Sequence, residues 1–189
     1  MIKLAVVGNI GSGKSYVARQ FGYPVFNADA EVNKLYKTSK KCFVKLKKLF
    51  PKYITSFPIK KNELLKAIMT NQFNLKKITK VVHPEIRIKM KIFLIRNGNK
   101  KIVVLDIPLL LENKINKKND ILIFVDAKKS QIYKRLKKRK NFNLKLFKRF
   151  KKIQLPVEFK KKKSHFILKN NFTDKFIQKG VKRILKEIL

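Results

Sequence analysis

Apolar residues along the chain fall into two kinds of pattern, and each predicts a different element. Short continuous runs rich in β-branched residues predict strands buried on both faces, as in a parallel sheet. These runs cover residues 2–7, 23–27, 102–106 and 121–126, with a weaker candidate at 164–168. From residue 31 to about residue 98, apolar residues instead recur at helical spacing, with a break at 51–58.

Periodic segments also predict helices between the strands. They lie at about residues 13–21, at 131–152 with an interruption at 141–143, and at 174–189. A short helix is expected between the strands at 102–106 and 121–126. The order is strand, helix, strand, a long helical insertion, strand, short helix, strand, helices, strand and helix. It predicts an α/β fold with three layers and a mainly parallel, five-stranded sheet.

A glycine-rich turn follows the first predicted strand. Its sequence, GNIGSGKS at residues 8–15, matches the phosphate-loop pattern G-x-x-x-x-G-K-[ST]. Gly8 and Gly13 let consecutive backbone N–H groups turn inward around a phosphate, and the helix that follows adds its positive end. Lys14 is expected to reach the β- and γ-phosphates and Ser15 to ligate Mg²⁺. The chain is therefore predicted to bind a nucleoside triphosphate.

The net charge of +38, from 49 Lys plus Arg against 11 Asp plus Glu, suggests a nucleic-acid partner. The basic residues are 42 Lys and only 7 Arg, and residues with A/T-rich codons make up half of the chain. Because Arg is the commoner specific base reader, this skew favours an A/T-rich genome over selected nucleic-acid binding. We expect no specific nucleic-acid partner, although non-specific electrostatic binding would follow from the charge alone.

Several other classes of protein are excluded or disfavoured. A single Cys42, expected in the core, excludes an intramolecular disulfide framework. No stretch approaches 18 uncharged apolar residues, so a soluble, cytoplasmic protein without a membrane partner is expected. A GTPase would need D-x-x-G after a strand, whereas Asp106 is followed by Ile107, Pro108 and Leu109. A small-molecule kinase fits the length better than a motor or transporter ATPase.

Acidic residues are rare in this composition, and two of them stand at or just after the ends of predicted strands. Asp29 stands where a carboxylate could accept the proton of an attacking hydroxyl, although it could equally cap the helix that follows. Asp106 is placed to hold a Mg²⁺-bound water, with a turn aspartate as the alternative. Ligands of parallel sheets bind beyond the carboxyl ends of the strands, where both residues lie.

The motifs taken together resemble the dephospho-coenzyme A kinase family over essentially the whole chain. The resemblance rests on GNIGSGKS, FNADAEVNKLY, HPEIR at 83–87 and VLDIPLLLE at 104–112, and more weakly on QIYKRLKKR at 131–139, Gln154 and KNN at 169–171. It implies a single P-loop kinase domain that uses ATP and Mg²⁺ to phosphorylate the 3'-hydroxyl of dephospho-coenzyme A. The implied parts are a core at about 1–30, 100–128 and 160–189, a helical acceptor-binding lobe at 31–99 and a helical lid at 129–159.

The resemblance also assigns roles by position. Asp29 matches the general base, and Arg135 and Arg139 match lid arginines that close on the phosphates. The residues matched to ATP binding are Gly8, Gly11, Ser12, Gly13, Lys14, Ser15, Tyr16 and, near the adenine, Asn170. The residues matched to the acceptor, besides Asp29, are His83, Pro84, Arg87, Pro108, Leu109, Leu110 and Glu112. The metal residues remain Ser15 and Asp106, as the loop motif and the strand end predict, and a monomer is expected.

The chain departs from the family pattern at a few positions. Tyr16 replaces a usual Thr, and Asn27 replaces the first acid of D-A-D. Ser164 and His165 replace the Ala-Asp that usually precedes the last strand, and His165 is expected to be structural. Phe172 replaces the Gly of N-x-G. The alternatives are another P-loop nucleotide or nucleoside kinase, or a basic RNA-associated P-loop binding protein.

Overall fold

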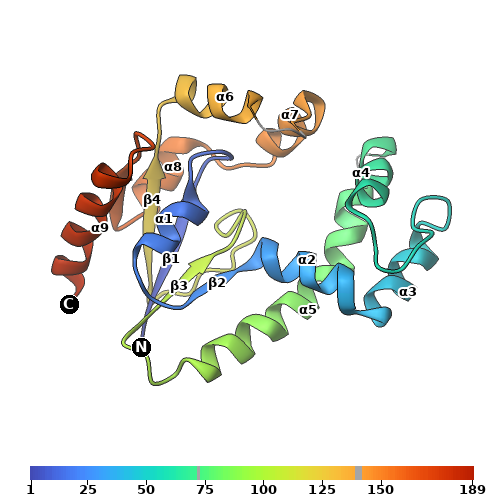
Figure 1. The fold of residues 1–189 in the computed structure, drawn as a ribbon, viewed down its shortest axis with the longest axis horizontal. Helices are drawn as coiled ribbons and strands as arrows, with labels where there is room; N and C mark the ends of the chain where they lie inside the picture. Colours follow the sequence, from blue (N-terminus) through green and yellow to red (C-terminus); the bar gives the residue numbers. More distant parts are fainter. Residues whose placement is uncertain (72, 139–141) are drawn as a thin grey trace. The chain divides into compact units, whose positions relative to one another are not determined.

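A five-stranded parallel sheet organises the N-terminal and C-terminal parts of the chain (Figure 1). The strands are β1 (Ile2–Gly8), β2 (Val25–Asn27), β3 (Ile102–Asp106), β4 (Asp120–Asp126) and β5 (Phe166–Lys169). Their order across the sheet is β2-β3-β1-β4-β5. The central strands form because their apolar runs are covered on both faces, as the continuous pattern predicts. The predicted fold class is therefore confirmed.

The computed structural model describes residues 1–71, 73–138 and 142–189. These residues form two units, one of residues 1–27 and 97–189 and the other of residues 28–96. The first unit contains the sheet with α1 (Lys14–Gln20), α6 (Lys129–Lys137), α7 (Leu144–Lys152), α8 (Val157–Lys163) and α9 (Asp174–Ile188). The second contains α2 (Ala28–Thr38), α3 (Lys40–Leu49), α4 (Lys61–Thr70) and α5 (Asn74–Arg96).

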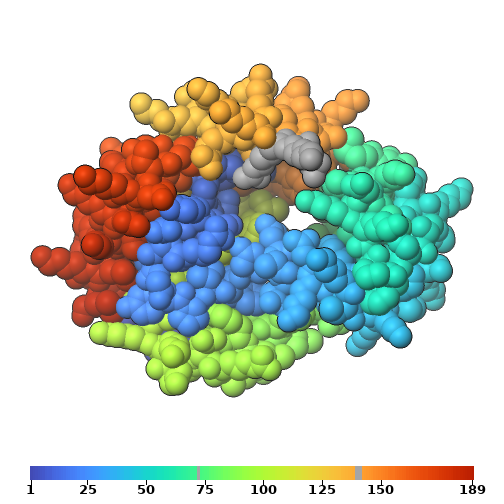
Figure 2. Space-filling model, in the orientation of Figure 1, coloured from blue at the N-terminus to red at the C-terminus, as the bar shows by residue number. Residues whose placement is uncertain are grey.

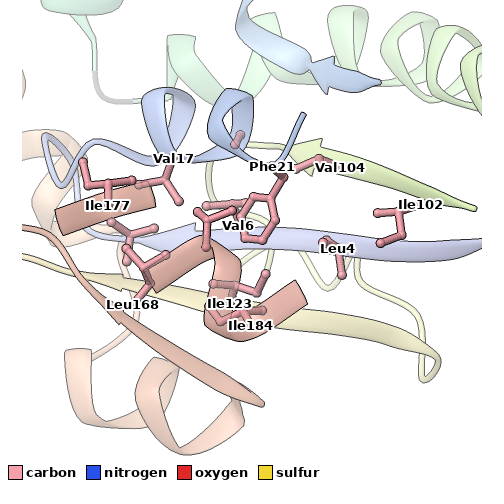
Figure 3. Close-up of a cluster of buried hydrophobic side chains, with 13 residues drawn as sticks. Leu4, Val6, Val17, Phe21, Ile102, Val104, Ile123, Leu168, Ile177 and Ile184 are labelled. Carbon is pink, nitrogen blue, oxygen red and sulfur yellow. The ribbon is translucent and has the colours of Figure 1, made fainter. Parts of the chain in front are cut away.

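The core of the first unit lies between the sheet and the helices α1 and α9. These two helices pack side by side, which Figure 2 shows as neighbouring blue and red surfaces. Val17 of α1, Ile184 of α9 and Val6 of β1 are fully buried in one cluster (Figure 3). Burying each such side chain stabilises the fold by about 1.5–3 kcal/mol. This cluster fixes the start of α1 against the end of β1, where the glycine-rich turn lies.

Two local predictions differ from the structure. The short helix expected after β3 is a series of turns over residues 108–114, in which Leu109 and Lys114 have φ of 54° and 51°. Left-handed residues end regular helical hydrogen bonding, so no helix forms there. Helix α8 was not predicted, because four consecutive lysines at 160–163 hide its apolar spacing. One of them, Lys160, is nonetheless buried.

His165 precedes β5 and extends its pairing with β4. Its backbone N–H donates to the Leu122 carbonyl oxygen at 2.9 Å, and its Nδ1 accepts from the Leu122 N–H at 3.0 Å. The imidazole thus takes the place of a backbone acceptor beside the sheet. These contacts agree with a structural role for this departure from the family pattern.

The second unit is built around α5, which packs against α2, α3 and α4. Cys42 of α3 is buried, and burial raises the pKa of its thiol to about 11, so it is a core residue as expected. Lys89 of α5 and Glu31 of α2 form an ion pair at 3.2 Å. The predicted break between helices is also present, between α3 and α4. Among the residues that the structure describes, no helix is both long and apolar enough to cross a membrane.

Candidate active site

The glycine-rich turn joins β1 to α1 and has a backbone that most residues could not adopt. Gly11 and Gly13 have φ of 82° and 91°, in the left-handed region. A Cβ at Gly13 would lie 2.5 Å from Nδ2 of Asn170, and one at Gly11 would lie 2.9 Å from Ile132 of α6. The glycines are therefore required both for backbone conformation and for close packing of the loop.

Lys14 folds back over this loop. Its Nζ donates to the carbonyl oxygens of Gly8 and Asn9 at 3.1 and 2.9 Å. The ammonium is therefore held at the loop, next to backbone N–H groups and the N-terminus of α1. All of these groups attract anions, so the loop is suited to bind the phosphates of a nucleotide.

Asn170 braces the loop from the end of β5. Its side chain is buried, and Nδ2 donates to the Ser12 carbonyl oxygen at 2.7 Å. Its Oδ1 accepts from the Phe172 N–H at 2.7 Å, and its own N–H donates to the Asp126 carbonyl oxygen at 2.6 Å. Asn170, expected near adenine, thus holds the loop directly. The nearby Phe172, with φ of 66°, packs its ring 4.4 Å from the Arg135 guanidinium carbon.

Replacing Asn170 by alanine should destabilise the protein by about 2–3 kcal/mol, because Ser12 and Phe172 would each lose a buried hydrogen-bond partner. The midpoint of urea denaturation, monitored by circular dichroism, measures this change. Replacing the exposed neighbour Asn171 by alanine is the matched control, with an expected loss under about 1 kcal/mol. Equal losses in the two variants would contradict the bracing role of Asn170.

Tyr16 turns away from the loop toward α9. Its hydroxyl donates to Oδ1 of Asp174 at 2.7 Å, and this hydrogen bond raises the pKa of Tyr16. The side chain at this departure from the family pattern therefore links α1 to the first turn of α9. Its backbone N–H bonds to the Gly13 carbonyl oxygen in the first turn of α1.

The two residues expected to hold Mg²⁺ both carry oxygen donors. Asp106 ends β3, which neighbours β1, and its buried carboxylate accepts from Nδ2 of Asn27 at 2.5 Å through Oδ2. Ser15 lies in the first turn of α1. Carboxylate and hydroxyl oxygens are hard ligands of the kind that Mg²⁺ prefers, and Mg²⁺ keeps several waters. Asn27, a departure from the family pattern, orients this carboxylate.

The turns after β3 bring the Pro108–Glu112 segment close to α8. Leu110 is buried, and the Glu112 side chain is only 10% exposed. Glu112 Oε1 accepts from the Leu155 N–H at 3.1 Å and lies 3.5 Å from Nζ of the buried Lys160. The structure thus directs this carboxylate into the protein, toward the chain that leads into α8.

A cavity of about 780 Å³ lies between the phosphate loop and the helices α6, α7 and α8. Apolar side chains such as Ile132 and Phe147 line it, together with Lys129, Lys148 and Lys151. Apolar walls with a few cationic groups suit an organic phosphate. Arg135 is exposed on α6, whereas Arg139 falls outside the described residues.

Four residues with expected acceptor roles belong to the helical unit. Asp29 is exposed in the first turn of α2, two residues after β2 ends. His83, Pro84 and Arg87 lie in α5, with Pro84 inside the helix. Burial lowers the pKa of His83, and the positive charge of Arg87 lowers it further. Both effects favour the neutral imidazole over the cationic form.

Comparison with known proteins decides the family. A family model for dephospho-CoA kinase matches residues 2–175. The chain belongs to the dephospho-CoA kinase family. This kinase is 32% identical over 190 residues to a dephospho-CoA kinase of Wolbachia from Brugia malayi, covering 98% of this chain and 97% of that one. The resemblance predicted from the motifs is therefore confirmed.

Solved structures agree on the fold of the kinase. The Thermus thermophilus protein TT1252 superimposes with a TM-score of 0.77 at 27% identity, covering 100% of this chain and 98% of that chain. A dephospho-CoA kinase from Campylobacter jejuni superimposes with a TM-score of 0.63 at 23% identity, covering 98% and 96%. Both likenesses extend over nearly the whole of each chain.

Some contacts of this kinase were not predicted from its sequence. The Ile10 N–H of the loop donates to Oε1 of Gln154 at 3.3 Å, across 144 residues of chain. The pairing of Lys160 with Glu112 was likewise missed. Gln154 had a sequence signal only through the family resemblance, and Lys160 had none among its neighbouring lysines.

Proposed function

We propose that this kinase transfers the γ-phosphoryl group of ATP to the 3'-hydroxyl of dephospho-coenzyme A, giving coenzyme A and ADP. The observation that carries the proposal is a fully formed phosphate loop in a chain that matches the dephospho-CoA kinase family over residues 2–175. The reaction is the last step of coenzyme A biosynthesis. We expect it to take place in the cytoplasm with the kinase as a monomer.

The loop supplies the ATP side of the reaction. Lys14 and the inward backbone N–H groups would hold the β- and γ-phosphates, and Arg135 would reach the phosphates when the lid helices close. Ser15 and Asp106 would hold Mg²⁺ or its waters, and the ion would neutralise charge that develops on the phosphoryl oxygens. Asn27 keeps the Asp106 carboxylate oriented for this task through its hydrogen bond.

Asp29 would act on the acceptor side. The 3'-hydroxyl oxygen would attack the γ-phosphorus as the bond between the γ-phosphorus and the β–γ bridging oxygen breaks and ADP leaves. The hydroxyl proton would pass to the Asp29 carboxylate. His83, Pro84 and Arg87 of α5, and Pro108, Leu109 and Leu110 after β3, would bind the rest of the acceptor. The cavity beside α6 and α7 offers apolar walls for the pantetheine arm and lysines for the diphosphate.

An acceptor panel tests the proposal. ADP release would be followed by a coupled assay with dephospho-coenzyme A, with nucleoside monophosphates and with shikimate as alternative acceptors. We expect ADP release that depends on dephospho-coenzyme A, and no comparable rate with the other acceptors. A higher kcat/KM for any other acceptor would replace this function with a different kinase activity on the same core.

A further inference from the structure

The segment between α7 and α8 connects the phosphate loop to the turns after β3. Gln154 Oε1 accepts from the Ile10 N–H of the loop, and the adjacent Leu155 N–H donates to Glu112 Oε1. Two consecutive residues of this segment therefore form hydrogen bonds with two different parts of the first unit. The position of Gln154 at the loop depends on both attachments.

The Glu112 attachment is reinforced by a buried lysine. Lys160 is only 1% exposed, and its Nζ lies 3.5 Å from Glu112 Oε1. Burial lowers the pKa of Lys160, while the Glu112 carboxylate acts in the opposite direction. Burying the charge of Lys160 is costly. Solubility does not explain it, because the many exposed lysines already supply surface charge. Its effect is to hold Glu112 against the start of α8.

Gln154 meets the loop at the peptide group that also holds Lys14. The Asn9 carbonyl oxygen of this peptide accepts from Lys14 Nζ, and the Ile10 N–H of the same peptide donates to Gln154. Lys14 reaches the β- and γ-phosphates in loops of this kind. The carboxamide of Gln154 therefore contacts the same peptide group as Lys14, the residue expected to reach the terminal phosphate.

The carboxamide of Gln154 also carries a hydrogen-bond donor. Because the Ile10 N–H needs an acceptor, the oxygen of Gln154 faces the loop, and its NH₂ group remains as a donor. Within the described part of the chain, Nε2 of Gln154 forms no hydrogen bond. Gln154 also lines the cavity beside the loop, together with Asn9 and Ile10.

We propose that Gln154 is a catalytic residue whose Nε2 donates a hydrogen bond to the γ-phosphoryl group of ATP, and that Glu112 and Lys160 are positioning residues that hold it at the loop. This inference rests on the proposed kinase function, since it requires ATP in the loop. It gives Glu112 a role different from direct acceptor binding. A fixed donor at this position favours the triphosphate and stabilises the charge that develops during transfer.

The dissociation constants of ATP and ADP, measured by titration calorimetry, test the role of Gln154. We expect Gln154→Leu to weaken ATP binding about fivefold to tenfold with ADP binding changed less than twofold, and kcat to fall about a hundredfold. Steady-state kinetics measure kcat. Gln178→Leu, the same change at an exposed position of α9, should alter neither dissociation constant. Equal weakening of ATP and ADP, or no weakening of ATP, would overturn the proposal.

The positioning residues are tested by the same preference for ATP over ADP. Since either single change leaves a buried lone charge, the double variant Glu112→Leu with Lys160→Met is used. We expect it to lose as much ATP preference as Gln154→Leu, and adding Gln154→Leu should cause no further loss. A lower melting temperature with the ATP preference intact would mean that the pair is only structural.

These measurements separate the two proposals. The binding constants need no acceptor, so they test Gln154 whatever compound is phosphorylated. Suppose that the wild type does not phosphorylate dephospho-coenzyme A, but that Gln154→Leu loses the preference for ATP over ADP. This pair of results would contradict the proposed function and support the inference about Gln154. If the wild type phosphorylates dephospho-coenzyme A and Gln154→Leu keeps the preference for ATP, the proposed function is supported and the inference about Gln154 is contradicted.

Discussion

Replacing Lys14 by alanine should lower kcat/KM for ATP by about 10²–10³-fold, because the loop loses the ammonium that it holds over Gly8 and Asn9. The remaining backbone N–H groups cannot supply a full positive charge to the γ-phosphate as it is transferred. Binding of dephospho-coenzyme A should persist, since the change lies on the ATP side. Steady-state kinetics and acceptor titration measure the two effects separately.

A matched lysine separates this effect from the general charge of the protein. Lys182→Ala removes one positive charge from the exposed side of α9, and it should change kcat/KM less than twofold. With a net charge of +38, the loss of one lysine barely alters the overall field. ATP turnover that is unchanged in Lys14→Ala would rule out the assignment of the phosphate loop.

Replacing Asp29 by asparagine should reduce kcat by about 10²–10⁴-fold while ATP binding stays nearly intact. Asparagine has a similar size and can still cap the first turn of α2, but it cannot accept the hydroxyl proton. The variant thus distinguishes the two roles that the sequence allows for Asp29. Single-turnover kinetics with saturating ATP report the chemical step directly.

The nearby acid Glu31 provides the control for Asp29. It lies in the same first turn of α2 and pairs with Lys89 at 3.2 Å, so Glu31→Gln should affect stability more than turnover. If Asp29→Asn retains turnover within a few-fold of the wild type, Asp29 is not the general base. Its carboxylate would then be a helix cap, as the alternative interpretation holds.

The fold was largely predictable because its strands and most helices have strong local patterns. The runs at β3 and β4 are apolar at almost every position, as is typical of strands covered on both faces of a parallel sheet. Helix α8 carries no such signal, since its buried face includes a lysine. The turns after β3 look helical in spacing, but left-handed residues at 109 and 114 end the helical hydrogen bonding.

The site was predictable where one local segment forms it and less so where distant segments meet. The loop motif alone predicted the positions of Gly13 and Lys14, because a strand, a turn and a helix define its geometry. The contacts of Gln154 with Ile10 and of Lys160 with Glu112 join segments far apart in the chain. No periodicity or spacing specifies such partners in a single sequence.

Analysis of the reaction product tests the central claim most directly. The purified kinase would be incubated with ATP, Mg²⁺ and dephospho-coenzyme A, and the product examined by mass spectrometry and ³¹P nuclear magnetic resonance. We predict coenzyme A, with one added phosphoryl group as a monoester on the 3'-oxygen, formed in equal amount to ADP. ADP formed without coenzyme A, or a phosphoryl group on any other oxygen, would contradict the account.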